Sequence, residues 1–234
     1  MESATVIGTP PDRLLDGLAG HDFTAREIAA RHALGLSEHD PAAPRPARAT
    51  RPNRSEEAAM TRFTVRRRWS GDLAGCERAL AAVHRADGYP VVWPEHPTDW
   101  LADSDQLAAW VAVAPDGTVV GHAALSSGSG SSAGAAWARR SGGAAEETGA
   151  VSRLFVDPGA RGHRLGARLL DSVVQQARSW LLLPVLDVVT ANTAAVRLYQ
   201  QQGWERLLTE DQHWSNGMTV AVHCFALTAA DDGR

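Results

Sequence analysis

The stretch LFVDPGARGHRLGARLL, residues 154–170, decides the fold. It continues an apolar run that begins at Val151 and predicts a buried strand over Val151–Val156. Asp157-Pro-Gly then indicates a sharp turn. From Leu165 to Trp180 apolar residues recur at spacings near four, which predicts a long helix. The segment is therefore expected to form a strand, a turn and the start of a helix.

The turn between this strand and this helix is suited to bind an anion. The first N–H groups of a helix have no intrahelical partner and lie at the positive end of its dipole. Gly162 and Gly166 allow a bulky ligand to approach the backbone, and Arg161 and Arg164 supply positive charge. No Gly-Lys-Ser/Thr follows, and the glycine spacing does not fit the dinucleotide fingerprint. The run predicts a ligand that carries a pyrophosphate.

A second informative segment is NTAAVRLYQQQGW, residues 192–204. It predicts a helix over Ala194–Gln202, with Asn192 or Thr193 available to cap its start and Gly203 placed to end it. An apolar run over Val185–Thr190 precedes it and predicts another buried strand.

Together the two segments resemble the GNAT superfamily of N-acetyltransferases. Residues 161–167 are similar to its acetyl-CoA-binding motif, Arg/Gln-x-x-Gly-x-Gly/Ala, and residues 192–204 to its Asn-x-x-Ala-x-x-Leu-Tyr-x-x-x-Gly-Phe/Trp segment. The resemblance covers roughly residues 62–227. Arg164 stands where the family most often has glycine. Arginine can adopt helical φ/ψ, so this residue need not break the turn, and its side chain either reaches the cofactor phosphates or points to solvent.

The resemblance implies an α/β fold: a mixed central sheet, splayed between the strands Val151–Val156 and Val185–Thr190 and flanked by helices. It also implies acetyl-CoA as co-substrate, with its pantetheine arm in the gap and an amine attacking the thioester directly. The implied cofactor-binding residues are Leu154, Phe155, Val156, Arg161, Gly162, His163, Arg164, Leu165, Gly166, Ala167 and Asn192.

For catalysis the resemblance implies that Tyr199 donates a proton to the departing thiolate, although a packing role for this tyrosine stays open. Asn192 either contacts the cofactor or only caps its helix. Many family members carry a glutamate near residues 149–152, where this chain has none. Candidate bases are Glu146 and Glu147, His122 or a water chain, and none is assigned.

The acceptor is expected to be the primary amine of a small molecule or peptide. In the family its pocket would be built by residues 87–100, residues 126–149 and the turn near Trp214. Four aromatic residues either form a wall of this pocket or close the edge of the core: Tyr89, Trp93, Trp100 and Trp214. Nearby acidic residues would suit a cationic acceptor or are simply solvated: Asp87, Glu95 and Asp99.

The remaining pattern completes the expected order of elements. It predicts a strand at Phe63–Val65, a helix from Leu73 ended by Gly88, and a hairpin of Ala108–Ala114 with Val119–Leu125. Two final strands, Trp204–Leu208 and Thr219–Leu227, are joined by an Asn216-Gly217 turn. The Ser/Gly/Ala-rich segment 126–149 is expected to be a long mobile loop.

Three domains are expected. Residues 1–60 form an extension with short helices at Pro11–Leu18 and Thr24–Leu34 and a Pro/Arg-rich, disordered linker. Residues 61–228 form the transferase domain, and residues 229–234 a tail.

Composition limits the function. A net charge of −4 argues against a dedicated nucleic-acid binder, and no apolar run is long enough to span a membrane. We expect a cytoplasmic protein with two buried thiols, Cys76 and Cys224, and assign no metal site; a homodimer is left open. Two alternatives to an enzyme remain: an acyl-CoA sensor or inactive module, and a regulator whose N-terminal helices bind DNA.

Overall fold

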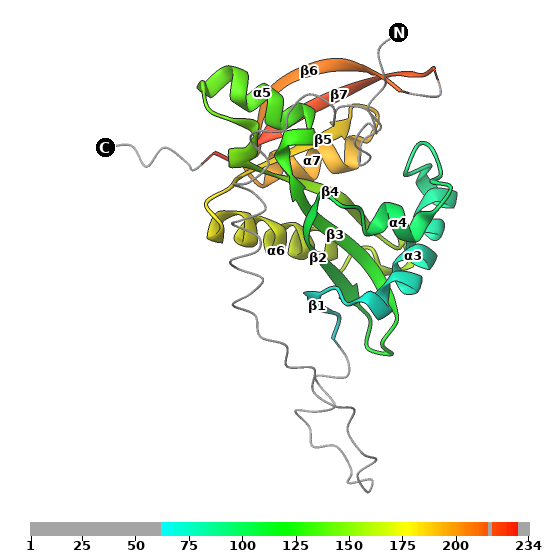
Figure 1. Cartoon of the computed structure of the whole chain (residues 1–234). Coiled ribbons are helices and arrows are strands. Elements are labelled where there is room, and N and C mark those ends of the chain that lie inside the picture. Colours follow the sequence, from blue (N-terminus) through cyan, green and yellow to red (C-terminus); the bar gives the residue numbers. More distant parts are fainter. Residues whose placement is uncertain (1–61, 215–216, 229–234) are drawn as a thin grey trace, which may run out of the picture.

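The computed structural model describes residues 62–214 and 217–228, which form one open seven-stranded sheet with helices on both faces (Figure 1). The strand order is β1-β2-β3-β4-β5-β7-β6; β4 and β5 are parallel, and every other neighbouring pair is antiparallel. The strands are β1 Thr64–Arg67, β2 Gln106–Val113, β3 Val119–Ser127, β4 Thr148–Val156, β5 Leu183–Val189, β6 Glu205–His213 and β7 Thr219–Ala226. The helices are α3 Leu73–Asp87, α4 Pro97–Leu101, α5 Ser132–Ser141, α6 Leu165–Ser179 and α7 Thr193–Gln201.

This architecture confirms the expected fold class of a mixed, splayed sheet flanked by helices. Helix α6 is the crossover that two neighbouring parallel strands require. The expected N-terminal helices, linker and C-terminal tail lie outside the described residues, as does Asn216 of the last hairpin.

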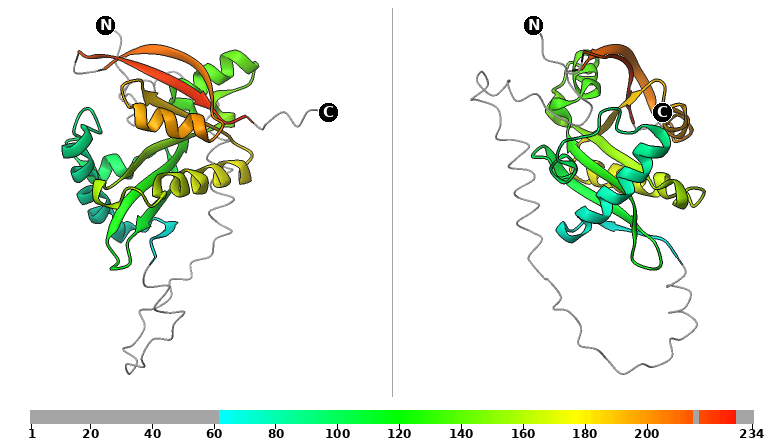
Figure 2. Two further views of the ribbon diagram at one scale, coloured as in Figure 1. Left: turned by 180° about the vertical axis from the view of Figure 1, so that it is seen from behind. Right: turned by 90° about the vertical axis from the view of Figure 1, so that its right-hand side faces the viewer.

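The two faces of the sheet carry different helices, and the alternation along each strand decides which side chain meets which helix. Leu186 and Phe225 belong to the core formed with α6 and α7. Their neighbours Val185 and Cys224 pack against α5 on the other face. Helix α3 covers that same face over β2, β3 and Phe155 of β4. Figure 2 shows α3 and α6 on opposite sides of the sheet.

Local signals position several elements as expected. Gly88 ends α3 in the left-handed conformation, with φ of 69°. Between β2 and β3 the backbone N–H of Thr118 donates to Asp116 Oδ1 at 2.9 Å, and Gly117 has φ of 85°. These residue types therefore act locally, and their elements agree with the sequence pattern.

The segment 126–149 was wrongly expected to be a mobile loop. Strand β3 runs to Ser127, 3₁₀ turns occupy Gly128–Gly130 and Ala145–Glu147, and α5 lies between them. The Ser131 side chain caps α5 by accepting from the N–H of Gly134 at 2.9 Å, and Gly142 ends it with φ of 74°. The segment is an ordered insertion that covers the end of the sheet at β5 and β7 (Figure 1).

Close packing explains why this helix is built largely from small residues. A Cβ atom at Gly134 would overlap the carbonyl oxygen of Gly128, and one at Gly128 would overlap the Thr148 side chain. Ala133 and Ala136 are at most 3% exposed against the sheet. Small residues are therefore required by the short distance between α5 and the sheet, and their composition resembles that of a loop.

Gly134→Ala tests this explanation, because helix propensity and packing predict opposite changes in the free energy of unfolding. Propensity alone would stabilise the helix by roughly 1 kcal/mol. We expect destabilisation instead, by about 1–3 kcal/mol, since the new methyl group must displace backbone atoms. Denaturant unfolding measures the difference. Gly130→Ala is the control, because only one atom, Asp105 Oδ2, lies within 4 Å of its added Cβ, at 3.8 Å. A more stable Gly134→Ala variant would contradict the proposed packing.

Candidate active site

The centre of the sheet contains a fork between β4 and β5. Their pairing runs from Thr148–Leu183 to Val151–Leu186 and then stops, whereas β5 stays paired with β7 to Val189. Exposure follows the pairing: the first four residues of β4 are buried, and Ser152, Leu154 and Val156 beyond them are partly exposed. On β5 the partly exposed positions after Leu186 are Asp187 and Val189. The edge of β4 that faces β5 therefore lacks a partner strand over residues 152–156.

A bulge in β4 lies beside the fork. On β3 only Ala123 separates His122 from Ala124, but their partners on β4, Phe155 and Ser152, are separated by two residues. Arg153, one of these two, has φ of 50°, a conformation that a non-glycine residue rarely adopts. Such a bulge bends the strand and redirects its backbone groups. Here it bends β4 where the ladder to β5 has ended.

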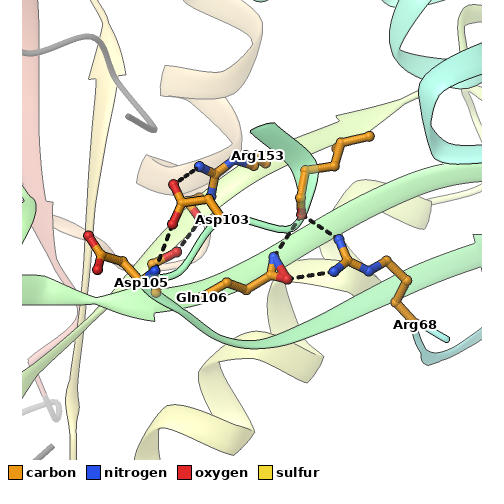
Figure 3. Close-up of polar contacts among 8 residues, drawn as sticks. Arg68, Asp103, Asp105, Gln106 and Arg153 are labelled. Atoms are coloured by element: carbon orange, nitrogen blue, oxygen red, sulfur yellow. Dashed lines mark hydrogen bonds and ion pairs between the residues drawn. The ribbon is translucent and has the colours of Figure 1, made fainter. Parts of the chain in front are cut away.

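Buried polar contacts hold the bulge in place (Figure 3). The Arg153 side chain is 1% exposed, forms an ion pair with Asp103 and lies 5.0 Å from the centre of the Trp100 ring. Next to it, Gln106 accepts from Arg68 at 2.6 Å and donates to the Leu101 carbonyl at 3.0 Å. The turn between α4 and β2 is thereby tied to β1 and to the bulge.

His122 is part of this scaffold and is not a base. It is fully buried, and its Nδ1 lies 3.0 Å from the carbonyl oxygen of Arg153, which can only accept, so Nδ1 carries the proton. Nε2 lies 3.0 Å from Arg68 Nη1 and accepts from it. Burial lowers the pKa of His122 to about 3. The imidazole is neutral, and both nitrogens are occupied.

The turn after β4 leads into α6 with two left-handed residues. Gly162 has φ of 84°, and Arg164 has φ of 57° and ψ of 23°. Arg164 thus leaves the turn intact, but it does so in the left-handed conformation that glycine favours and not with right-handed helical angles. The first α6 backbone bond runs from the N–H of Arg168 to the carbonyl of Arg164 at 3.1 Å, and no side chain caps the helix start. The preceding N–H groups of α6, residues 165–167, are thus available to a ligand.

The other residues of this turn have distinct surroundings. Gly166 faces the fork side, where an added Cβ would approach only Leu198 and Val156, at 3.8 and 4.0 Å. Leu165 is 2% exposed in the core. His163 packs on the Phe63 ring at 4.5 Å, and its Nδ1 lies 3.2 Å from the carbonyl of Ala160. His163 therefore supports the turn.

Arg161 forms an ion pair with Asp87, the last residue of α3. Both side chains are about half exposed, 48% and 41%, so the pair is weak in water. A stronger anion at this turn could replace the carboxylate of Asp87 and free the guanidinium group of Arg161 to bind it.

Tyr199 lies on the α7 side of the fork. It is 6% exposed, and its ring packs against Trp204 at 5.9 Å and Phe225 at 6.2 Å. Burial, with a smaller contribution from Tyr89, raises the pKa of its phenol above the ordinary value. Its hydroxyl makes no hydrogen bond with any residue that the structure describes. The side chain therefore packs and also keeps a protonated hydroxyl free.

Asn192 caps α7, since its Oδ1 accepts from the N–H of Ala195 at 3.2 Å. Capping was one of the two expected roles, and it occupies the side-chain oxygen. A contact of Asn192 with a cofactor stays a prediction.

The aromatic residues expected near the acceptor are only partly gathered. Tyr89 packs on Trp100 at 6.4 Å and on Phe155 at 6.5 Å, on the α3 face of the fork. Trp93 packs instead against His84, with the ring centres 5.1 Å apart. Trp214 is 4% exposed, and its Nε1–H donates to Gln212 Oε1 at 3.2 Å. The structure thus places two of the four at the fork.

Asp187 is a residue that the sequence analysis missed. Its Oδ1 accepts from the N–H of Ala133 in α5 at 2.8 Å, and Cys224 Sγ lies 3.4 Å away. Burial raises the pKa of this carboxyl to about 6. The available signal was an acid within an otherwise apolar strand, VLDVV at 185–189.

The thiols of Cys76 and Cys224 are buried, which raises the pKa of each and keeps them unreactive.

Residues 62–214 and 217–228 show neither a membrane-spanning helix nor a metal-binding cluster. No helix there has the length and apolarity to cross a bilayer. Nor does that part of the chain contain a cluster of three or more His, Cys, Asp or Glu side chains that could hold a metal ion.

Comparisons with known proteins agree with this geometry. No curated protein sequence matches the chain significantly. Its fold is similar to that of NAA60 from Arabidopsis thaliana in complex with acetyl-CoA, with a TM-score of 0.55 and 21% identity over 71% of this chain and 98% of that one. It is also similar to an N-acetyltransferase from Staphylococcus aureus Mu50, with a TM-score of 0.54 and 18% identity over 71% of this chain and 98% of that one. A third similar fold is that of a GCN5-related N-acetyltransferase from Kribbella flavida, with a TM-score of 0.52 and 21% identity over 71% of this chain and 98% of that one.

The sequence model of the acetyltransferase (GNAT) family matches residues 78–204, which is more than half of the chain and runs from within α3 to just past the end of α7. The fork, the uncapped start of α6 and Tyr199 all lie inside that match. The chain therefore belongs to the acetyltransferase (GNAT) family.

Proposed function

We propose that this chain is an N-acetyltransferase that moves the acetyl group of acetyl-CoA to a primary amine by direct attack. The observation that carries the proposal is the fork: an unpaired edge of β4 leads directly to the glycine-containing, uncapped start of α6. One ligand with an extended amide-bearing arm and a pyrophosphate would satisfy both features. The family membership and the acetyl-CoA complex of the similar NAA60 fold support this choice.

The residues of the fork fit such a ligand. The free β4 edge, residues 152–156, offers backbone N–H and carbonyl groups to the amides of the pantetheine arm, as an added strand would. The pyrophosphate would bind the N–H groups at the start of α6, with Arg161 released from Asp87 to face it. Gly162 has open space within 4 Å of an added Cβ, so a phosphate can approach its backbone. When bound, acetyl-CoA supplies an activated thioester.

Tyr199 is proposed as the general acid. A thiol has an ordinary pKa of about 8.5, so its thiolate leaves more easily when a nearby group gives it a proton. Burial keeps the Tyr199 phenol protonated at neutral pH, and no described residue holds its hydroxyl. For Tyr199 to act as the acid, the sulfur of acetyl-CoA must lie at the fork beside its hydroxyl. A structure of this chain with acetyl-CoA bound would test that position.

A second candidate function is an acyl-CoA-binding sensor without turnover. It is favoured by one observation: β4 starts Thr-Gly-Ala-Val-Ser, residues 148–152, without a carboxylate that could accept the proton of an amine. The two functions differ in thiol release and agree in cofactor binding.

Calorimetric titration with acetyl-CoA, followed by a thiol-release assay on the same sample, distinguishes them. The amine panel contains spermidine, tyramine, L-methionine, a peptide with a free α-amine and a peptide with an internal lysine. We expect binding and thiol release with at least one amine class. Binding without release across the panel would favour the sensor, and the lack of any binding would refute both functions.

Gly166→Glu tests the position of the pyrophosphate. The new carboxylate would lie at the start of α6, where it blocks the backbone and repels phosphate. We expect acetyl-CoA binding to be lost in the titration. Gly71→Glu is the control, because Gly71 is exposed and has nothing within 4 Å of an added Cβ. Unchanged affinity of the Gly166→Glu variant would show that the phosphates bind elsewhere.

Tyr199→Phe tests the general acid. Removing the hydroxyl keeps the ring contacts with Trp204 and Phe225, so folding and cofactor affinity should hold. We expect kcat to fall by roughly 100-fold, the usual range for the loss of a proton donor. Wild-type turnover of this variant would leave Tyr199 with a packing role only.

A further inference from the structure

Asp187 lies at the branch point of the fork. Val151 and Leu186 are the last paired residues of β4 and β5, so Asp187 is the first β5 residue beyond the ladder, at the level of Ser152. As whole residues both are partly exposed, whereas Val185, Leu186 and Val188 are at most 6% exposed. The carboxyl group of Asp187 itself is buried, which raises its pKa. This is the only acid in β5, and it lies where the two strands begin to separate.

The side chain of Asp187 lies on the face of the sheet opposite to Tyr199. It contacts Ala133 of α5, on the face where α3, α4 and α5 pack. Tyr199 packs with Leu186 and Val188, which point to the α7 side of the same strand. The fork therefore has a carboxylate on one face of the sheet and a phenol on the other. A thioester held between them would meet an amine from the Asp187 side and lose its thiolate toward Tyr199.

The contacts of Asp187 are with donors at the start of α5 and with a thiol, and not with a cation. One oxygen accepts from Ala133 N–H and is approached by the Cys224 thiol, and the Ser131 hydroxyl bonds to the carboxylate as well. No described Arg, Lys or His forms an ion pair with it. The N–H group at the start of α5 favours a negative charge, so these contacts stabilise the ionised carboxylate in part. What sets Asp187 apart is its position at the branch point of the fork, on the face opposite to Tyr199.

The other candidate bases in the described chain have different roles. The nitrogens of His122 are both occupied. Asp103 and Asp87 are paired with arginines, and Glu146 and Glu147 lie exposed in the turn before β4. These assignments leave Asp187 as the acid at the fork without a cationic partner.

We infer that Asp187 is the general base of the transfer reaction, an inference that rests on the proposed function. Its carboxylate accepts one proton from the acceptor ammonium group, directly or through one water, which leaves a neutral amine. The amine nitrogen bonds to the thioester carbon, and the C–S bond breaks as the tetrahedral adduct collapses. The thiolate takes the Tyr199 proton, and the second amine proton restores the phenol. Asp187 returns its proton to solvent, so one proton is released per acetyl group.

The titration of Asp187 has identifiable neighbours. The carboxylate of Glu210 on β6 raises its pKa in addition to burial, while the bonds from Cys224, Ala133 and Ser131 lower it. Arg139 of α5 lies 3.9 Å from Glu210 and does not reach Asp187. Together these groups give a pKa of about 6, so the carboxylate is ionised and weakly basic at neutral pH.

Asp187→Asn is the test, with Asp171→Asn, at an exposed position of α6, as the matched control for replacing a carboxylate by an amide. The assay measures kcat/KM with acetyl-CoA and the best amine of the panel. The pH is varied from 5 to 9, so that the measurements lie on both sides of the pKa expected for the base. Wild type and Asp171→Asn should lose activity below a midpoint of about pH 6. In Asp187→Asn this fall of kcat/KM on the acid side, the acid limb of the profile, should be absent. Its kcat/KM should be roughly 100-fold lower than that of wild type, and its affinity for acetyl-CoA should be unchanged.

Two results would overturn the inference. Asp187→Asn with full turnover and an intact acid limb would show that another group takes the proton. Loss of acetyl-CoA binding in Asp187→Asn would show that the residue only holds the fork and α5 together. If wild type itself binds no acetyl-CoA or releases no thiol, the proposed function fails and the inference falls with it.

Thermal unfolding against pH checks independently that Asp187 titrates as stated. Its folded pKa is raised from 3.8 to about 6, so the unfolded state releases the proton more readily. The contribution of Asp187 to stability is complete below pH 3.8 and is lost as the pH rises through 6. The melting temperature of Asp187→Asn relative to wild type should therefore increase over this interval. A constant difference would mean that the carboxyl does not titrate there.

Discussion

The end of hydrogen bonding between β4 and β5 after the pair Val151–Leu186 is the constraint on which the rest of the site depends. An interior strand normally satisfies its backbone groups on both edges, and unpaired groups are costly when buried. Here the far half of β4 keeps β3 on one edge only. Because these positions are partly exposed, solvent or a ligand can replace the missing strand. The sheet thereby provides a binding edge within its own interior.

Several contacts act together to keep the strands apart. The bulge at Arg153 bends β4, and the buried guanidinium group of that residue is held by Asp103 and Trp100. On the other strand, Asp187 and Cys224 connect β5 and β7 with the start of α5. The two strands are thus bound to different neighbours, β4 to the α4–β2 turn and β5 to the α5 insertion.

The fork also orders the chemistry that such a site can perform. Helix α6 begins at its open end and presents unbonded N–H groups there, while α7 places Tyr199 against one face of the strands. The opposite face carries Asp187 and the aromatic cluster around Phe155. A ligand in the fork would have its phosphates at one end and its reactive carbon between an acid and a base. The proposed roles of Tyr199 as acid and Asp187 as base depend on their lying on different faces of the sheet.

Sequence alone determined the order of the seven strands and of helices α3, α6 and α7, the place of the turn before α6 and the family resemblance, because these features depend on local periodicity and on residues close together in the chain. Tertiary structure decided the rest. Segment 126–149 forms α5 because its glycines fit against the sheet, a distance that no local pattern encodes. Arg164 takes a left-handed conformation because the turn requires it, whatever the residue prefers. Asp187 and Tyr199 lie on opposite faces of one fork because pairing between β4 and β5 ends at a particular residue, and strand pairing joins segments distant in sequence.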